Sequence, residues 1–313
     1  MTLNWLVIGI GDITRRRVIP AILEEPRSQL YGLLTRDPRK AEAYPGARVW
    51  AALHTALADP ALDAVYVASP VALHAPHAIA SLRAGKHVLC EKPVAMNYPQ
   101  AESMVAAARA SGRLLGVAYY RRLYPKVLRT RQLIAEGAIG QPVLVEANAQ
   151  TWLPGEHRSW LWDAAMAGGG PLYDTASHRI DLFNCLFGRP LRATGLLSNA
   201  VHSLPVEDSA TVVIDYPNGV RGIMDARWNS RPERDQFRVI GTDGELNLDP
   251  LNGPALRYAG REETLPAHAN LHYPAIENFV SAVCDATPLM CRGEEAIWTD
   301  WVTEQVRQQS ARL

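Results

Sequence analysis

The sequence predicts an α/β protein that begins with a parallel β-sheet wound with helices and continues into a second domain containing further strands. Three observations lead to this prediction. Short apolar runs alternate with helical stretches over the first 120 residues, glycines directly follow the first run, and turn signals separate short runs in the second half. The 313 residues, 48% of them hydrophobic, suffice for about two domains with their own cores. We place these domains at residues 1–120 and 121–313.

Composition and charge exclude several classes of partner. Lys plus Arg and Asp plus Glu each total 32, so the net charge is zero and favours neither nucleic acid nor an anionic membrane surface. The chain starts with a strand rather than a basic and apolar leader, and it has no apolar run of about twenty residues, which predicts a cytoplasmic location. Four scattered cysteines fit neither a disulfide framework nor a zinc spacing, so no metal site is expected.

The prediction depends most on the apolar run Trp5–Ile8, which leads through glycines into a helix. Such a turn presents free backbone N–H groups and a positive helix end to one point, which suits a pyrophosphate. Gly9 would make the tight turn and Gly11 would admit the phosphates, but Thr14 fills the third small position and leaves the fingerprint incomplete. An ordinary turn is the alternative, and Pro20 should kink or end the helix. The cofactor-binding residues expected here are Gly9, Gly11, Asp12 and Ile13.

The residues after the second predicted strand, 30–34, favour NADP over NAD. In a dinucleotide fold, an acid about 20 positions beyond the glycines favours NAD, whereas a basic residue tolerates the 2′-phosphate of NADP. Thr35 and Arg36 occupy these positions, and a hydroxyl and a guanidinium can both bind a phosphate. Asp37 comes two residues late and is interpreted as a turn or cap residue. The predicted cofactor is NADP, with NAD as the alternative.

Residues after the apolar run 64–68 are expected to line the cofactor site. The run predicts a strand buried on both faces, and ligands bind at the carboxyl ends of such strands. Ser69, Pro70 and His74 follow it. A helix-cap or packing role is an equal alternative for His74, and His77 is expected at the surface.

The predicted strand 87–90 delivers an acid and a lysine, Glu91 and Lys92. A stability role explains them poorly, because lysine is rarely buried without a partner. Pro93 fixes the direction in which the chain leaves the strand, so the Lys92 side chain is expected to have a fixed direction as well. A functional role is therefore expected of Glu91 and Lys92 at this edge of the sheet, where the cofactor would bind.

Two longer motifs complete the pattern. Residues 84–93 read Ala-Gly-Lys-His-Val-Leu-Cys-Glu-Lys-Pro, and residues 168–181 read Gly-Gly-Gly-Pro-Leu-Tyr-Asp-Thr-Ala-Ser-His-Arg-Ile-Asp. With the N-terminal glycine turn, they resemble the glucose-fructose oxidoreductase and inositol dehydrogenase family, Gfo/Idh/MocA, over essentially the whole chain. The resemblance implies a Rossmann domain, then an α+β domain with a large, mostly antiparallel sheet whose open face serves oligomer contacts. We therefore expect a homo-oligomer, a dimer or tetramer, formed through that sheet.

Local signals in the second half agree with such a sheet. The turns Pro217-Asn218-Gly219 and Thr242-Asp243-Gly244 are typical of hairpins. The strands expected besides those above are 114–118, 143–149, 192–198, 211–216, 220–228, 237–240 and 245–248. A helix is expected over 294–311, and the resemblance implies that it packs back against the first domain.

The helical stretch after residues 168–170 carries the predicted chemistry. Asp174, His178 and Asp181 fall at i, i+4 and i+7 and share one face, where a carboxylate can orient an imidazole. Histidine gives and takes a proton near neutral pH most readily. Oxidising an alcohol with NAD(P)+ removes the hydroxyl proton while hydride leaves the same carbon, and Lys92 and His178 suit that oxygen. A surface ion pair is the alternative for Asp174 and His178 alone.

The resemblance assigns roles to these residues. His178 would be the general acid/base, Lys92 the cation that stabilises alkoxide character on the reacting oxygen, and Asp174 a hydrogen-bonding and orienting group for the substrate. Glu91 would lie near the nicotinamide ribose, and Asp181 would give structural support. The predicted catalytic residues are thus Lys92, Asp174 and His178.

Two departures from the family pattern fall on the substrate side. Trp160 is followed by Leu161 where the family commonly has Trp-Arg, so that contact is absent or supplied elsewhere. Tyr119 and Tyr120 replace a frequent asparagine and could wall a pocket. His272, which precedes a helix, is a further candidate because the loop there often faces the substrate in related enzymes. The substrate-binding residues expected are Lys92, Tyr120, Trp160, Asp174, His178 and His272.

These observations together predict an NAD(P)-dependent oxidoreductase, NADP-linked, that transfers hydride between nicotinamide and a hydroxyl or carbonyl carbon of a sugar, polyol or related small molecule. Reduction of a C=C or C=N bond, or glycoside cleavage through transient oxidation, is an alternative within the same fold. A cofactor-binding regulator without turnover is the alternative from another class, and the intact trio of Lys92, Asp174 and His178 argues against it.

Overall fold

The computed structural model describes residues 2–153 and 155–310. The chain divides into two compact units: unit 1 comprises Met1–Tyr120 and His268–Ile297, and unit 2 comprises Arg121–Ala267 and Trp298–Leu313. The segment His268–Ile297, which follows the predicted boundary at residue 120, therefore belongs to unit 1. No helix in the described ranges is both long and apolar enough to cross a bilayer.

Unit 1 contains a six-stranded parallel sheet. Its strands are β1 (Leu3–Ile8), β2 (Ser28–Leu34), β3 (Arg48–Trp50), β4 (Ala64–Val67), β5 (His87–Cys90) and β6 (Leu115–Val117). Their order is β3-β2-β1-β4-β5-β6, the order of a dinucleotide-binding fold, in which ligands bind where it reverses, between β1 and β4. The parallel sheet and five of its strands confirm the prediction. β3, only three residues long, has no counterpart in it.

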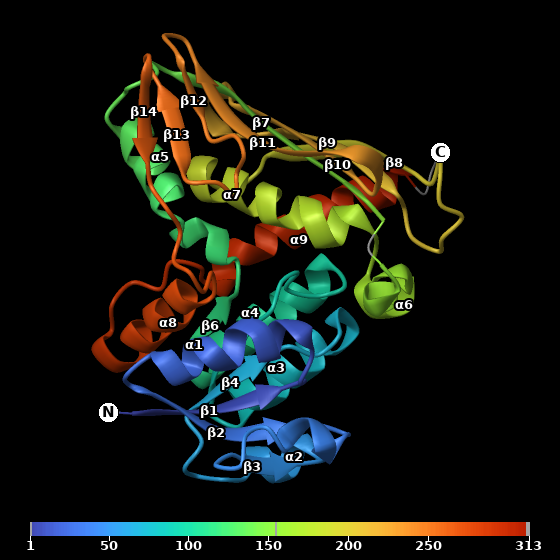
Figure 1. The fold of residues 1–313 in the computed structure, drawn as a ribbon, viewed down its shortest axis with the longest axis vertical. Coiled ribbons are helices and arrows are strands. Elements are labelled where there is room, and N and C mark those ends of the chain that lie inside the picture. The colour runs from blue at the N-terminus through green and yellow to red at the C-terminus, as the bar shows by residue number, and fades with distance from the viewer. Residues whose placement is uncertain (1, 154, 311–313) are drawn as a thin grey trace. The chain divides into compact units, whose positions relative to one another are not determined.

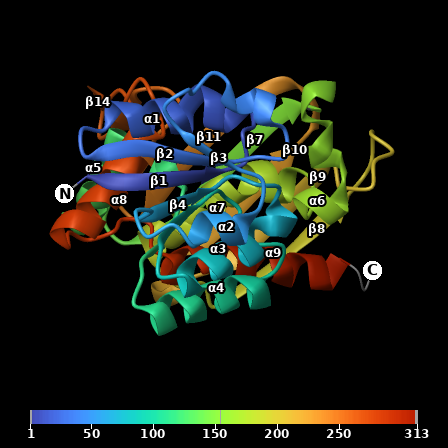
Figure 2. The ribbon, with the colours of Figure 1, turned by 90° about the horizontal axis from the view of Figure 1, so that it is seen from below.

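Helices cover both faces of this sheet (Figure 2). The helical segments are η1 (Thr14–Val18), α1 (Ile19–Glu24), η2 (Pro38–Ala41), α2 (Leu53–Leu57), η3 (Val71–Leu73), α3 (His74–Arg83), α4 (Tyr98–Ser111), η4 (Tyr120–Leu123), which leads into unit 2, and α8 (Tyr273–Asp285). Ile22 of α1 and Phe279 of α8 pack with Trp5 of β1 in one buried cluster. Residues of α2, α3 and α4 form a second cluster with the alternate strand residues, such as Leu6.

The first helical segment changes type at Pro20. η1 is a π-helix, in which the N–H of Ile19 donates to the carbonyl of Thr14, and α1 starts at Ile19 with Pro20 in its first turn. Proline is tolerated there because the first N–H groups of a helix have no partner within it. The helix therefore does not end at Pro20 as predicted, and the proline instead stands where a π-turn changes to an α-helix. The Thr14 hydroxyl also donates to the carbonyl of Gly11 at 2.9 Å, which closes the glycine turn.

Unit 2 contains an eight-stranded sheet in the order β14-β13-β12-β11-β7-β10-β9-β8 (Figure 1). Its strands are β7 (Pro142–Trp152), β8 (Arg192–Ser198), β9 (Ser209–Asp215), β10 (Arg221–Arg227), β11 (Asn229–Gly241), β12 (Glu245–Asn247), β13 (Ala255–Tyr258) and β14 (Arg261–Thr264). β7 and β10 pair parallel, and the other neighbours pair antiparallel. The predicted, mostly antiparallel sheet is confirmed. β13 and β14 are strands that the sequence did not predict.

The long helices of unit 2 lie on one face of the eight-stranded sheet, and shorter helical turns connect its elements (Figure 1). The helical segments are α5 (Pro125–Ala135), η5 (Glu156–Trp162), α6 (Ala164–Ala167), η6 (Leu172–Ala176), α7 (Ser177–Phe187), η7 (Pro217–Gly219) and α9 (Gly293–Ser310), whose first five residues belong to unit 1. Phe183 of α7 packs on Phe237 of β11, with ring centroids 5.5 Å apart. α9 matches the helix predicted over 294–311, of which residue 311 lies outside the described residues.

The other face of this sheet carries no helix among the described residues (Figure 1). Its side chains are polar or charged at many positions and pair across neighbouring strands. Asp215 of β9, for example, lies between Arg221 of β10 and Arg192 of β8, at 2.9 and 2.7 Å. One face of the sheet is therefore the core of unit 2, and the other is left open.

Candidate active site

The glycine turn after β1 lies where the strand order of unit 1 reverses. Gly9 has a φ of 90°, and a Cβ there would lie 2.6 Å from the carbonyl oxygen of Ala68, so only glycine fits this close approach to the end of β4. A Cβ on Gly11 would meet no described atom within 4 Å, which leaves room for a ligand over this residue. Asp12 and Ile13 are exposed beside it. That a pyrophosphate binds over this turn stays a prediction.

The segment after β2 carries the residues predicted to select the cofactor. Thr35 is half-buried and Arg36 is exposed. The Asp37 carboxylate accepts a hydrogen bond from the N–H of Arg39 at 3.2 Å and pairs with its guanidinium at 2.9 Å. The interpretation of Asp37 as a cap residue is confirmed. The Arg39 side chain also lowers the pKa of Asp37, so this carboxylate stays ionised and is occupied by its own neighbour.

Two histidines of α3, His74 and His77, contact the residues that follow β4. His74 is 1% exposed, and its Nδ1 and Nε2 each lie 2.9 Å from a backbone carbonyl, of Pro93 and Ser69 respectively. Its ring therefore links the chain after β4 to the chain after β5. His77 lies 3.1 Å from the Ser69 hydroxyl and is partly exposed, so it is nearer to the predicted site than its expected surface position indicated. Burial lowers the pKa of both histidines.

Four of the predicted site residues come together at the end of β5. Glu91 is buried and Lys92, the next residue, is partly exposed. The Glu91 Oε1 lies 3.3 Å from the Nε2 of His272, and the His272 ring lies 4.5 Å from the ring of Tyr120. Tyr66 of β4 donates its hydroxyl hydrogen to the same Oε1 at 2.8 Å. Sequence reasoning missed Tyr66, because a tyrosine inside an apolar strand has the pattern of an ordinary core residue.

The glycine triplet of unit 2 is explained by close packing. A Cβ on Gly168 would lie 2.6 Å from the ring of Tyr173, and one on Gly170 would collide with the carbonyl oxygen of Glu207. The Glu207 side chain accepts a hydrogen bond from the N–H of Leu172 at 3.0 Å, and burial raises the pKa of this carboxyl. The triplet thus lets the helical segment start against Glu207. That it also brings the helix close to the cofactor stays a prediction.

The two predicted catalytic residues of unit 2 lie on consecutive segments. Asp174 is in the π-turn η6, and His178, which is 6% exposed, is in α7. A π-turn has more residues per turn than an α-helix, so the simple i, i+4 argument does not apply through η6. Both oxygens of Asp174 lie near the Nη2 of Arg158, at 3.3 and 3.1 Å. Arg158 was missed because it lies 16 residues earlier, in a segment without periodicity.

Asp181 has the structural role that was expected of it. Its carboxylate accepts two hydrogen bonds from Arg122, at 2.9 and 2.8 Å, and both side chains are 1% exposed. A bidentate, buried pair of this kind fixes α7 against η4. The helix that carries His178 therefore rests on a charge pair that is out of contact with water.

The remaining substrate candidate, Trp160, lies on the surface of unit 2. It is 46% exposed, whereas Leu161 is buried in a cluster with Trp228. Leu161 thus occupies an interior position that an arginine could not take without a partner. Arg158 approaches Asp174 from the same segment instead.

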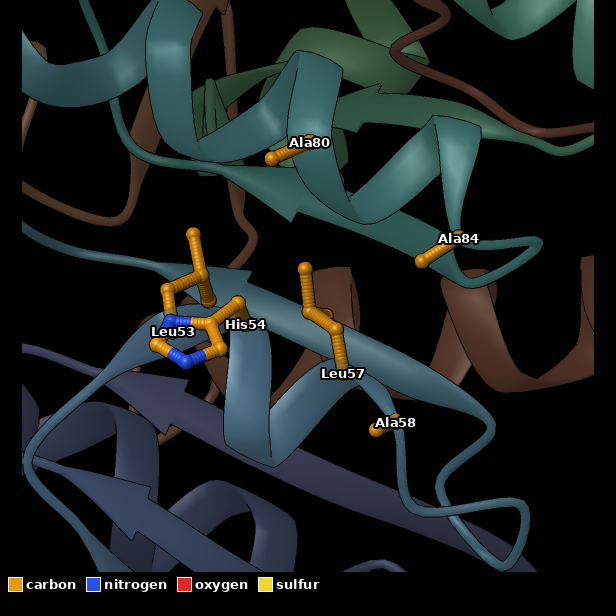
Figure 3. Close-up of a pocket in the computed structure, with 6 residues that line it drawn as sticks. All are labelled: Leu53, His54, Leu57, Ala58, Ala80 and Ala84. Atoms are coloured by element: carbon orange, nitrogen blue, oxygen red, sulfur yellow. The ribbon is translucent and has the colours of Figure 1, made fainter.

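One hollow of about 610 Å³ lies between α2 and α3 (Figure 3). Its lining is largely apolar and includes Leu53, Leu57 and Ala80. Ala58 and Ala84, also in the lining, precede the amino ends of β4 and β5, opposite to the edge where the glycine turn lies. None of the predicted site residues lines it. In the described part of the chain, no group of His, Cys, Asp and Glu side chains is arranged to hold a metal ion.

Comparisons with known proteins agree with this geometry. The model of the oxidoreductase family with an NAD-binding Rossmann fold matches residues 3–119, and that of the GFO/IDH/MocA C-terminal domain matches residues 127–247. A 1,5-anhydro-D-fructose reductase of Ensifer adhaerens is 31% identical over 310 residues, 95% of this chain and 92% of that protein. A D-xylose 1-dehydrogenase [NADP(+)] of Haloarcula marismortui is 27% identical over 265 residues, 80% of this chain and 73% of that protein.

A solved structure shows the same fold. The aldose-aldose oxidoreductase of Caulobacter crescentus matches 100% of this chain and 98% of its own, with a TM-score of 0.90 and 24% identity. Fold, glycine turn and relatives thus define an oxidoreductase with an NAD-binding Rossmann domain, a dehydrogenase or reductase acting on CH–OH groups. The chain belongs to the Gfo/Idh/MocA family, as its motifs predicted.

Proposed function

We propose that this protein is an NADP-linked oxidoreductase that interconverts a hydroxyl and a carbonyl group on a sugar or polyol. The observation that carries the proposal is the end of β5, where the buried Glu91 carboxylate precedes Lys92. β5 is the neighbour of β4, one of the two strands at which the order of the sheet reverses. A lysine on this edge is well placed to act on a ligand bound there.

The residues of unit 1 fit a dinucleotide. The open space over Gly11 and the N–H groups of Asp12 and Ile13 suit the pyrophosphate. Ser69, Pro70, His74 and Glu91 follow β4 and β5 on the same edge, and Lys92 would reach the nicotinamide end. Thr35 and Arg36 would hold the 2′-phosphate of NADP, and Asp37 is occupied by Arg39. The name of the xylose dehydrogenase relative includes NADP(+), which supports the same choice. NAD is the alternative.

The cofactor preference is tested by the variant Arg36→Ala. It should weaken NADPH binding at least tenfold, because a guanidinium on a phosphate contributes about 1.5–3 kcal/mol, and it should change NADH binding little. Arg83→Ala, which alters an exposed arginine on α3, is the matched control. Fluorescence titration measures both affinities. Equal losses for the two cofactors would contradict the assignment of Arg36 to the 2′-phosphate.

The chemistry requires a proton acceptor and a cation at one oxygen. The nicotinamide, when bound, accepts or returns the hydride. We assign removal of the hydroxyl proton to His178, stabilisation of negative charge on that oxygen to Lys92, and hydrogen bonding to a substrate hydroxyl to Asp174. In reduction, His178 returns the proton to the oxygen. Tyr120, Trp160 and His272 would contact the rest of the substrate, His272 through its Nδ1, which is buried and has no partner among the described residues.

A turnover screen tests the proposed function. Absorbance at the NADPH band is followed with NADPH or NADP+ against sugars, polyols and dicarbonyls, starting with 1,5-anhydro-D-fructose and D-xylose, which the names of the two relatives suggest. We expect turnover with one of them and its loss in Lys92→Ala. If none of these compounds is turned over but a compound with a reducible C=C or C=N bond, assayed in the same way, is, the alternative reaction is favoured. A cofactor-binding protein without turnover would favour the regulator.

Assembly and location are also proposals. The helix-free face of the unit 2 sheet would form a dimer or tetramer by pairing with a second copy, and sedimentation equilibrium would measure the mass. A cytoplasmic location and packing of the C-terminal helix against the first domain stay predictions.

A further inference from the structure

Glu91 is held by side chains from two other parts of unit 1. Its Oε1 accepts a hydrogen bond from the Tyr66 hydroxyl at 2.8 Å and lies 3.3 Å from the His272 Nε2. Its Oε2 accepts one from the backbone N–H of Lys92 at 3.2 Å. Tyr66 lies in β4, and His272 lies 181 residues further along the chain than Glu91. Three donors from separate positions therefore fix both oxygens of one carboxylate.

The surroundings of Glu91, Tyr66 and His272 determine which of these side chains carry a proton. Burial alone would raise the pKa of Glu91, but the hydrogen bond and the electrostatic effect of His272, the hydrogen bond from Tyr66 and the charge of Lys92 outweigh it and leave the pKa lowered. The carboxylate is therefore ionised at neutral pH and only accepts hydrogen bonds. Burial and the neighbouring carboxylate raise the pKa of Tyr66 well above its usual value, so its hydroxyl keeps its proton and donates. The His272 Nε2 must carry a hydrogen as well.

The contact to Lys92 connects this carboxylate to the proposed chemistry. The side chain of Glu91 accepts from the N–H of the next residue, so the orientation of the carboxylate and that of the Lys92 backbone are coupled. If the carboxylate rotates, the position from which the lysine side chain starts moves too. A misplacement of about 1 Å can cost a catalytic group on the order of a hundredfold in rate.

The segment that carries His272 is itself anchored. The Asn270 side chain donates to the carbonyl of Arg17 at 2.8 Å and accepts from the N–H of His272 at 3.1 Å. The ring of His272 lies 4.5 Å from that of Tyr120 and is 1% exposed, while its Nδ1 has no partner among the described residues. An unsatisfied buried nitrogen destabilises the folded state. A phenyl ring would fill this space without that cost, so packing alone does not explain the histidine.

We propose that Tyr66 and His272 are positioning residues for Lys92, which they orient through the Glu91 carboxylate. The proposal rests on the proposed function of Lys92. Nothing in the sequence motifs points to Tyr66, and the role expected of His272 was contact with the substrate. Through Glu91, Tyr66 and His272 would set the orientation of Lys92 before the reaction. In this role neither side chain contacts a reacting atom.

The kinetic test compares variants that keep or remove each donor. Tyr66→Phe and His272→Asn each remove a donor to Oε1 and should lower kcat about tenfold or more. His272→Gln, whose amide nitrogen reaches the position of Nε2, should retain kcat within about threefold and raise the KM of the sugar, because the Nδ1 acceptor is lost.

A matched control separates positioning from stability. Tyr31→Phe removes a tyrosine-to-carboxylate hydrogen bond of the same kind, to Asp59 at 2.9 Å, elsewhere in unit 1. The Tyr31 bond is partly buried whereas the Tyr66 bond is buried, so Tyr31→Phe should lose less thermal stability than Tyr66→Phe, and it should keep kcat. If Tyr66→Phe retains the kcat of the parent, or if His272→Gln is as impaired as His272→Asn, the proposal is wrong.

A measurement without turnover keeps the test independent of the substrate. In ¹⁵N imidazole NMR spectra at pH 7, the signals lost in His272→Gln belong to His272, and they should show a hydrogen on Nε2. A ring with a bare Nε2 and a hydrogen on Nδ1 would overturn the proposed contact with Glu91. If no compound of the panel is turned over but Nε2 carries the hydrogen, the proposed function is wrong, whereas the hydrogen bond from His272 to Glu91 is supported.

Discussion

The carboxyl edge of the unit 1 sheet and the helical start of unit 2 carry the two halves of the proposed chemistry, and they are built differently. In unit 1, Glu91 and His74 follow strands, and buried hydrogen bonds hold them. In unit 2, Asp174 lies in a π-turn, and its partner Arg158 is 42% exposed. Strand ends deliver side chains to a common edge because the sheet fixes them. A helical start depends on packing from distant segments, here Glu207 and the buried Arg122–Asp181 pair.

The largest effect should come from breaking the support beneath the helix of unit 2. Asp181→Asn removes the carboxylate that pairs with Arg122 in a buried site, and breaking a buried pair of this kind should cost about 3–5 kcal/mol of the free energy of unfolding. Urea denaturation measures it. The double variant Arg122→Met with Asp181→Leu removes both charges and should recover most of the loss. A loss under about 1 kcal/mol for Asp181→Asn would show that α7 does not depend on the pair.

Substitutions of Gly9 and Gly11 test the glycine turn after β1 in unit 1. Gly9→Ala should cost about 2–4 kcal/mol, because the new Cβ would meet the Ala68 carbonyl at a φ of 90°. Gly11→Ala should leave stability within about 0.5 kcal/mol but weaken NADPH binding about tenfold or more, since its Cβ enters the space proposed for the phosphates. Thermal melts and fluorescence titration separate the two. Unchanged NADPH affinity in Gly11→Ala would contradict the phosphate site.

Stability should depend on pH through His87, at the amino end of β5. Burial, helped by Arg113, lowers its pKa to about 4, and its Nδ1 accepts a hydrogen bond from the N–H of Leu114 at 3.2 Å. The unfolded ring binds a proton near pH 6.5, so between about pH 6.5 and 4 the unfolded chain holds more protons and stability falls as the pH falls. Allowing for partial exposure, we expect a loss of about 1–2 kcal/mol over this window.

The matched variants for this pH dependence are His87→Asn and His54→Asn. The asparagine oxygen at position 87 keeps an acceptor for Leu114 but does not titrate, so urea midpoints should fall less steeply between pH 6.5 and 4 than in the parent. His54, exposed on α2, serves as the control. Identical pH profiles for the parent and His87→Asn would exclude His87 as the source.

The smallest effect on stability and activity should come from replacing Arg158, the exposed partner of Asp174 in unit 2. Arg158→Gln should leave stability nearly unchanged, since exposed pairs contribute about 0–1 kcal/mol. It should raise the KM of the substrate about threefold to tenfold, because it removes the guanidinium that pairs with Asp174. Arg192→Gln breaks a similar exposed pair, with Asp215, on the open sheet face and should leave KM unchanged. Equal KM values for both variants would mean that Arg158 does not orient Asp174.

Sequence reasoning reached the fold through patterns that are local. The strand over 87–90 was predicted with its exact bounds because apolar residues and flanking polar residues define it, and Asp37 was recognised as a cap from its place two residues late. β3, with only three residues, and β13 and β14, with four each, are too short to show a period.

The parts of the site that sequence reasoning missed depend on distant partners. Tyr66 meets Glu91 only because β4 and β5 are neighbours in the sheet, and Arg158 meets Asp174 across an irregular segment. His77 was expected at the surface because its contact with the Ser69 hydroxyl depends on how the chain turns after β4. Burial and hydrogen-bond partners of this kind depend on how distant segments pack together, and the local sequence pattern does not show this packing.

The central claim, that Lys92 and His178 act on the same substrate oxygen, is tested most directly by a double-mutant cycle on single-turnover hydride transfer. Lys92→Met and His178→Asn should each slow transfer about a thousandfold, and the double variant should be little slower than either single one, because residues that act as a unit are not additive. Losses that multiply in the double variant, or a single variant with nearly full activity, would contradict the account.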